Sequence, residues 1–153
     1  MHSRIFQVNK KPIKEEDYIS ESDYWEHWFT NEIADYVVDS DDRNDDIKWL
    51  KESAKGYTVG HDINGDYIMI TNRIEYFSNA FKRFKETLDS IKDCTIEHFI
   101  DGMHEIWSLK NVYEDRFGFY VDANGELMTF DSFIRYCNEG DIYYIGGTLD
   151  YHC

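Results

Sequence analysis

Two short turn sequences constrain the fold of this chain more than any other feature. The pattern Asp-x-Asn-Gly followed by an acidic residue occurs at residues 62–66 and again at residues 122–126. Each copy lies between runs of β-branched and aromatic residues, in the stretches 57–71 and 118–130. Asn-Gly favours a tight hairpin turn, because a type I′ turn needs positive φ at two successive residues. We therefore expect two β-hairpins and a sheet that is built on them.

Hydrophobic periodicity predicts the remaining elements. Strands are expected at residues 3–8 and 142–151, and Gly146-Gly147 indicates a bulge or a close backbone approach in the second of them. Helices are expected at residues 20–38, with a capping box of Ser20 and Asp23, and at 45–55, 74–91, 95–107 and 131–138. This order predicts one α+β domain over residues 1–153, with a largely antiparallel sheet and helices packed on one face.

The stretch 74–91 has the clearest helical pattern in the chain. Its apolar residues recur at spacings of three and four: Ile74, Phe77, Phe81, Phe84, Leu88 and Ile91. We expect this stripe to be buried against the sheet, because an amphipathic helix needs an apolar surface to cover it. Exposure of Phe81 and Phe84 in the monomer would instead indicate an oligomer interface.

Composition limits the class of protein. The chain has 153 residues, of which 42% are hydrophobic and 17% aromatic, so it can bury a single core. Its three cysteines, Cys94, Cys137 and Cys153, are odd in number and widely spaced, which is typical of reduced thiols. No apolar stretch has the length of a membrane span, and the first residues lack the apolar run of a signal peptide. We expect a cytoplasmic protein.

No catalytic or metal-binding motif is recognisable. In an EF-hand loop, Gly is the sixth residue and a bidentate Glu the twelfth, whereas Gly65 and Gly125 follow their Asp by only three positions. A nucleophile elbow and a glycine-rich phosphate loop are absent. Glu97, Asp101 and His104 share one face of an expected helix, but no second helix repeats their spacing, so a solvated face is favoured. We therefore expect no metal site and no cofactor.

Acidic residues are concentrated in one part of the chain. Residues 15–46 contain thirteen acidic side chains and one basic side chain, Arg43, so this tract carries −12 of the formal net charge of −15. The strong negative charge argues against direct binding to nucleic acid or to an anionic membrane, since both need a basic surface. The tract also contains six aromatic residues, which indicates an ordered segment and not a mobile acidic tail.

The acidic tract has two interpretations. Carboxylates near helix starts offset the positive end of the helix dipole, and this accounts for about half of them. The other interpretation is a site that binds a basic protein surface, such as that of a nucleic-acid-binding enzyme. The predicted partner-binding residues are Glu21, Asp23, Tyr24, Trp25, Glu26, Asp35, Asp39, Asp41, Asp42, Asp45 and Asp46.

These observations favour a non-enzymatic, acidic protein-binding protein. It would act as an inhibitor, or as an immunity or anti-defence protein, by mimicking the phosphate charges of nucleic acid. Two alternatives remain open at this stage. One is a small cytoplasmic enzyme or ligand-binding domain whose pocket is assembled from distant residues, and the other is a scaffold subunit. A concave pocket would favour the first alternative, and a large exposed apolar patch the second.

Overall fold

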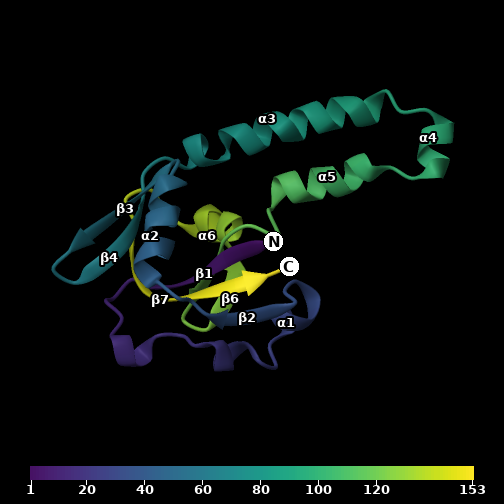
Figure 1. Cartoon of the computed structure of the whole chain (residues 1–153). Helices are drawn as coiled ribbons and strands as arrows, with labels where there is room; N and C mark the ends of the chain where they lie inside the picture. Colours follow the sequence, from purple (N-terminus) through teal and green to yellow (C-terminus); the bar gives the residue numbers. More distant parts are fainter.

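The computed structural model describes all 153 residues as an α+β structure with a seven-stranded, mostly antiparallel open sheet (Figure 1). The strands are β1 (His2–Asn9), β2 (Tyr36–Asp39), β3 (Tyr57–Asp62), β4 (Gly65–Ile70), β5 (Tyr120–Ala123), β6 (Glu126–Thr129) and β7 (Ile142–His152). The helices are α1 (Trp28–Glu32), α2 (Arg43–Glu52), α3 (Arg73–Lys92), α4 (Ile96–Asp101), α5 (His104–Tyr113) and α6 (Phe130–Tyr136). Two 3₁₀ turns, η1 (Glu15–Asp17) and η2 (Glu21–Tyr24), precede α1.

The centre of the sheet is formed by the first and last strands. The order is β3-β4-β7-β1-β5-β6, and only the β1–β5 pair is parallel. β1 lies antiparallel to β7, with His2 opposite His152 and Ile5 opposite Leu149. The expectation of a sheet built on the two hairpins is therefore wrong at its centre, because β3–β4 and β5–β6 lie at opposite ends of the strand order and are joined through β7 and β1.

The two Asp-x-Asn-Gly sequences form different turns. Between β5 and β6, Ala123 pairs with Glu126, and Asn124 and Gly125 both have positive φ, at 58° and 82°. This is the backbone of a type I′ turn. Between β3 and β4, Asp62 pairs with Gly65, so the tip is Ile63-Asn64 and the glycine already belongs to β4.

A bulge in β7 lies opposite Gln7. Phe6 pairs with Thr148 and Val8 with Ile145, so β7 contains one extra residue at Gly146-Gly147. The Gln7 side chain enters this space, and its Oε1 accepts a hydrogen bond of 2.9 Å from the Gly147 N–H. A Cβ on Gly146 would lie 2.4 Å from that oxygen. The sequence-based prediction of a bulge and a close approach is confirmed.

Helices cover both faces of the sheet, which corrects the expectation of helices on one face. Successive strand residues point to opposite faces, so the adjacent Ile5 and Phe6 belong to different cores. The core around Phe6 includes residues of α2 and α6: Ile47, Leu50, Phe130, Phe133 and Ile134. The core around Ile5 includes Tyr24 of η2 and Phe29 of α1.

The expected helix over residues 20–38 is divided into three elements. The capping box of Ser20 and Asp23 is present, but the turn that it starts ends at Tyr24. After α1, residues Tyr36–Asp39 form strand β2, which pairs with the end of β7. β-branched Val37 and Val38 favour a strand, and the free edge of β7 supplies the hydrogen bonds that stabilise it there.

The helix expected over residues 74–91 is present as α3, but the expectation that its apolar stripe is buried against the sheet is wrong. α3 contains no buried residue, and beyond its first turns it packs against α5 and not against the sheet. α3, α4 and α5 form an arm that projects from the body of the molecule (Figure 1). Phe81 is 64% exposed, while Phe84 is partly covered. An apolar stripe shows that a helix needs an apolar partner but does not identify the partner.

Three further observations complete the fold. The expected helix 95–107 is broken at Gly102, where φ is +102°, and becomes α4 and α5. Cys94, Cys137 and Cys153 are free thiols, as predicted. None of the helices combines the length and the apolar character that crossing a membrane requires.

The β5–β6 turn gives a direct test of backbone strain. Replacing Gly125 with Val should lower the free energy of unfolding by about 1 kcal/mol or more, because a β-branched residue resists positive φ. A Cβ at this position would meet no atom within 4 Å, so the cost is conformational and not steric. Glu126→Val, on the adjacent exposed strand position, is the matched control and should leave stability nearly unchanged in denaturant titrations. Equal effects of the two changes would contradict the type I′ turn.

Candidate functional site

The acidic tract is a continuous part of the chain that begins on the sheet face covered by η2 and α1, away from the arm, and ends at the start of α2 (Figure 1). It runs through η1, η2, α1, β2 and the start of α2. Eleven of its thirteen carboxylate residues are exposed, Glu21 is partly exposed, and Asp46 is buried. Of the predicted partner-binding carboxylates, those exposed are Asp23, Glu26, Asp35, Asp39, Asp41, Asp42 and Asp45.

Two of the predicted partner-binding residues lie inside the protein. Tyr24 is 2% exposed, and its hydroxyl donates a 2.8 Å hydrogen bond to Asp122. Burial and the neighbouring Asp122 carboxylate raise the pKa of Tyr24, which keeps this donor protonated. Asp46 is 3% exposed and accepts hydrogen bonds from Arg4, Ser40 and Thr148. These two side chains stabilise the fold and are out of reach of a partner.

The one basic side chain of the tract points inward. β4 pairs with Ile142–Tyr144 of β7 and β2 with its last four residues, which leaves a gap on this edge. Arg43 fills the gap: its guanidinium donates to the carbonyl oxygens of Ile145, at 2.8 Å, and Gly146, at 2.7 Å. It also pairs with Asp66 of β4 at 2.9 Å. Arg43 therefore completes the sheet edge and does not neutralise the exposed carboxylates.

Several exposed carboxylates also have a local structural role. Asp42 begins α2 by accepting hydrogen bonds from the N–H groups of Asn44 and Asp45. Asp39 accepts a 2.8 Å hydrogen bond from the N–H of Glu21, and so joins β2 to η2. Such bonds to backbone N–H groups leave the negative charge in place. Both interpretations of the tract therefore apply to the same residues, since a capping carboxylate still contributes to the surface potential.

Few of these charges are compensated by cations. Among the thirteen carboxylates, ion pairs join Glu16 to Lys14 at 3.9 Å and Asp35 to His152 at 2.9 Å, besides the buried pair of Arg4 and Asp46. The other ten form no ion pair. Trp25 is 70% exposed and lies between Tyr24 and Glu26 in the sequence of the tract. The arrangement combines uncompensated negative charge with three exposed aromatic rings, since Trp28 and Tyr36 of the tract are also exposed, at 46% and 42%.

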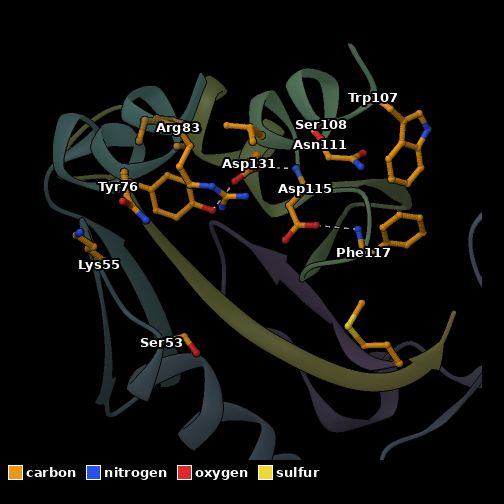
Figure 2. A pocket seen from close by; sticks show the side chains of 15 residues that line it. Ser53, Lys55, Tyr76, Arg83, Trp107, Ser108, Asn111, Asp115, Phe117 and Asp131 are labelled. Atoms are coloured by element: carbon orange, nitrogen blue, oxygen red, sulfur yellow. Dashed lines mark hydrogen bonds between the residues drawn. The ribbon is translucent and has the colours of Figure 1, made fainter. Parts of the chain in front are cut away.

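A cleft of about 610 Å³ lies between the arm and the body (Figure 2). Tyr76 of α3 and Asp131 of α6 meet at its wall, where the tyrosine hydroxyl donates a 2.7 Å hydrogen bond to the carboxylate. Burial and this carboxylate raise the pKa of Tyr76. Asp115, Arg83 and a lysine also line the cleft. This cleft could not be predicted from the sequence, because its residues come from five separated segments of the chain.

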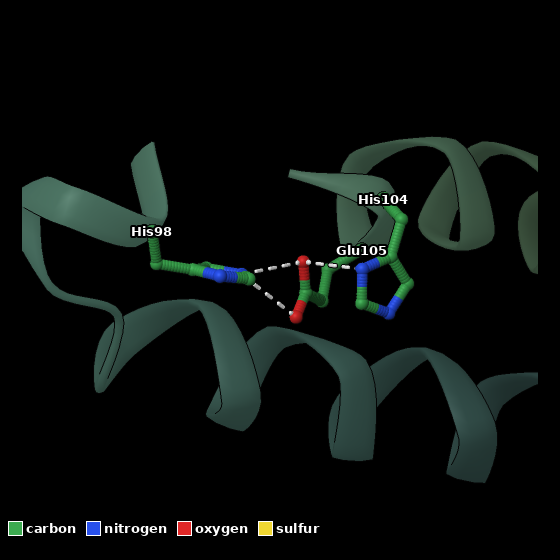
Figure 3. A group of neighbouring side chains, drawn as sticks. All are labelled: His98, His104 and Glu105. Carbon is green, nitrogen blue, oxygen red and sulfur yellow. Dashed lines mark hydrogen bonds and ion pairs between the residues drawn. The ribbon is translucent and has the colours of Figure 1, made fainter. Parts of the chain in front are cut away.

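A second group missed by the sequence analysis lies at the tip of the arm (Figure 3). His98 of α4 and His104 of α5 lie on either side of the Glu105 carboxylate. A backbone hydrogen bond at Glu105 and the hydrogen bond from His98 lower the pKa of Glu105. The sequence analysis considered Glu97, Asp101 and His104, which share a face only on an unbroken helix. The break at Gly102 brings His98 and Glu105 to His104 instead.

Comparison of this chain with protein-family models, with curated proteins and with solved structures finds no match. The chemistry of the acidic tract, the cleft and the tip of the arm is therefore what indicates a function for this chain.

The neighbouring residues Asp45 and Asp46 separate structural from exposed carboxylates in one experiment. Asp46→Ala should lower the free energy of unfolding by roughly 3–5 kcal/mol, because it removes one partner of a buried ion pair. The effect should lie near the lower end of this range, since Arg4 keeps its contact with Asp150. Asp45→Ala changes an exposed residue of the same charge and should alter stability by about 0.5 kcal/mol or less. Denaturant unfolding of both variants measures the difference, and similar losses would contradict the buried pair.

Proposed function

We propose that this chain is a non-enzymatic protein that binds a basic protein surface through its acidic tract. The main support for the proposal is that the Arg43 side chain is directed at β7 and away from the exposed carboxylates of the tract. The tract's one cation is bound to the carbonyl groups of β7, while eleven carboxylates of the tract are exposed. Crowded like charges destabilise a folded protein by mutual repulsion, so their uncompensated presence supports a role in binding.

The contact set of the proposed site is narrower than the sequence-based set. Tyr24 and Asp46 are omitted because they are buried. The residues that remain are Glu21, Asp23, Trp25, Glu26, Asp35, Asp39, Asp41, Asp42 and Asp45. Trp25 supplies an anchor that charge alone lacks, because residues that dominate interface energies are commonly Trp, Tyr or Arg.

The partner class follows from the charge. Proteins that bind nucleic acid have surfaces with clustered lysine and arginine, which release counterions when phosphates bind. An ordered row of carboxylates can occupy the same surface and displace the nucleic acid. The proposed role is therefore that of an inhibitor, or of an immunity or anti-defence protein, that acts on a nucleic-acid-binding enzyme. Encounter should be steered by long-range attraction and should weaken as salt screens the charges.

Competition with nucleic acid tests this function. The protein is added to candidate nucleases and DNA-binding proteins of its host, and nucleic acid is titrated against it at low and high salt. The variant Asp39→Asn/Asp41→Asn/Asp42→Asn should compete less well, chiefly through an association rate about tenfold lower or more at low salt. Its fold should survive, because Asn can accept the same capping hydrogen bonds as Asp.

The control removes the same charge elsewhere. Asp89→Asn/Asp93→Asn/Asp101→Asn alters three exposed residues on the arm and should compete as well as the unchanged protein. If both triple variants lose activity equally, net charge and not the tract is responsible. If neither loses it, or no target is displaced, the mimicry proposal is abandoned.

The cleft between arm and body supports a second candidate, a ligand-binding domain. It combines apolar walls with the carboxylates of Asp115 and Asp131 and the guanidinium of Arg83, which is a common composition for a small-molecule site. Trp107 lines this cleft, whereas Trp25 lies in the acidic tract. A ligand in the cleft should therefore change the fluorescence of Trp107, and the Trp107→Phe variant should lose that signal.

The arm supports the third alternative, a scaffold subunit. Several of its apolar side chains are largely exposed: Ile74, Phe81, Ile96, Phe99, Ile100, Ile106 and Trp107. Exposed apolar surface of this kind marks interaction sites in many proteins. It agrees with a protein-binding role, through a surface separate from the acidic tract.

A further inference from the structure

We propose that His98, His104 and Glu105 form a zinc-binding site at the tip of the arm. The site does not depend on the proposed function, because it lies on the arm and shares no residue with the acidic tract. It replaces the sequence-based expectation that the chain has no metal site.

The three donor groups converge without any rearrangement of the backbone. Nε2 of His98 lies 3.0 Å and 3.1 Å from the two carboxylate oxygens of Glu105. Nδ1 of His104 lies 3.5 Å from one of these oxygens. One ligand atom from each residue can be chosen so that all three lie within 4.8 Å of one another. Figure 3 shows the two imidazoles directed at the carboxylate from opposite sides.

These separations fit tetrahedral zinc. With bonds of about 2.0–2.1 Å, two ligands of a tetrahedral zinc ion lie about 3.3 Å apart. The distances from Oε2 of Glu105 to Nε2 of His98, 3.0 Å, and to Nδ1 of His104, 3.5 Å, lie on either side of that value. The remaining separation, between the two imidazole nitrogens, has to shorten. His104 can provide this change, because its side chain is 80% exposed and is free to rotate.

The ligand types select the metal. Imidazole nitrogen suits zinc and the later transition metals, whereas calcium and magnesium prefer sites made of oxygen ligands. Two histidines and one carboxylate form the protein ligand set of several catalytic zinc sites, in which a fourth position stays open. Here the exposed side of His104 leaves that position accessible to water or to a side chain of a partner.

The closeness of the three ligands in the sequence keeps the entropy lost on ordering the site small. All three ligands lie within residues 98–105, so little loop-closure entropy is lost when they meet. Gly102, with φ of +102°, provides the change of direction that places α4 beside the start of α5. Bound zinc would join these two helices across the turn and stiffen the end of the arm.

A cobalt titration tests the site. The full chain, without a histidine tag and treated with a chelator, is titrated with Co²⁺ and then with Zn²⁺. We expect one equivalent of Co²⁺ to give the visible absorption of a tetrahedral site and one equivalent of Zn²⁺ to abolish it. His98→Ala, His104→Ala and Glu105→Gln should each weaken binding about tenfold or more, since even outer-shell changes cost about 10–100-fold.

The chain offers a matched control in a second histidine pair. His2 and His152 have ring centroids 5.0 Å apart, and each contacts a carboxylate, Asp150 or Asp35, at 2.9 Å. The variant His2→Ala/His152→Ala should bind metal as the unchanged protein does. Circular dichroism of each variant verifies that it is folded.

Hydrogen exchange gives an independent measurement. Zinc should slow the exchange of amides in α4 and in the first turn of α5 without changing the exchange of the central strands. The proposal is overturned if no one-to-one saturation is reached, if His98→Ala and His104→Ala both keep the original affinity, or if only the His2→Ala/His152→Ala variant loses binding.

Discussion

The antiparallel pairing of β1 with β7 is the interaction on which the rest of the structure depends. It joins the two hairpins into one sheet and separates the two cores that lie on its faces. The irregularity in this pair is itself stabilised by two side chains. The Gln7 side chain occupies the space at the bulge and accepts a hydrogen bond from the N–H of Gly147. Arg43 donates hydrogen bonds to the carbonyl oxygens of Ile145 and Gly146. Buried backbone groups that a regular ladder would satisfy are satisfied here by side chains.

Ion pairs inside the structure help a chain with a net charge of −15 to remain folded. Two arginines are directed into the structure, Arg4 to Asp46 and Asp150, and Arg43 to Asp66. Burial alone would raise the pKa of Asp66, but the hydrogen bonds from His61 and Arg43 outweigh this effect and lower it. The pair of Arg43 and Asp66 therefore stays charged. The cations thus stabilise the sheet, and the acidic tract keeps its charge at the surface. Fold stability and surface potential therefore depend on different residues.

Local features could be predicted from the sequence because neighbouring residues determine them. The capping box at Ser20 follows from residues three positions apart, and the Gly146-Gly147 pair is a local sign of a bulge even though its partner Gln7 is distant. Features that depend on distant partners could not be predicted. Residues Tyr36–Asp39 became a strand because β7 had a free edge, and α3 found its partner in α5 and not in the sheet. In the acidic tract, nothing local distinguishes buried Asp46 from exposed Asp45, and the tip cluster depends on a helix break at Gly102.

The position of β7 has a consequence for synthesis of the protein. The ribosome produces β1 first and β7 more than a hundred residues later, and until then β1 lacks its antiparallel neighbour. Contacts so distant in sequence form slowly, because a long loop must close before they contribute. During this interval the local hairpins and the arm can already form, while the inner edge of β1 is open to other unpaired strands. Nascent chains that stall before Ile142 are therefore the species most exposed to aggregation and to chaperone capture.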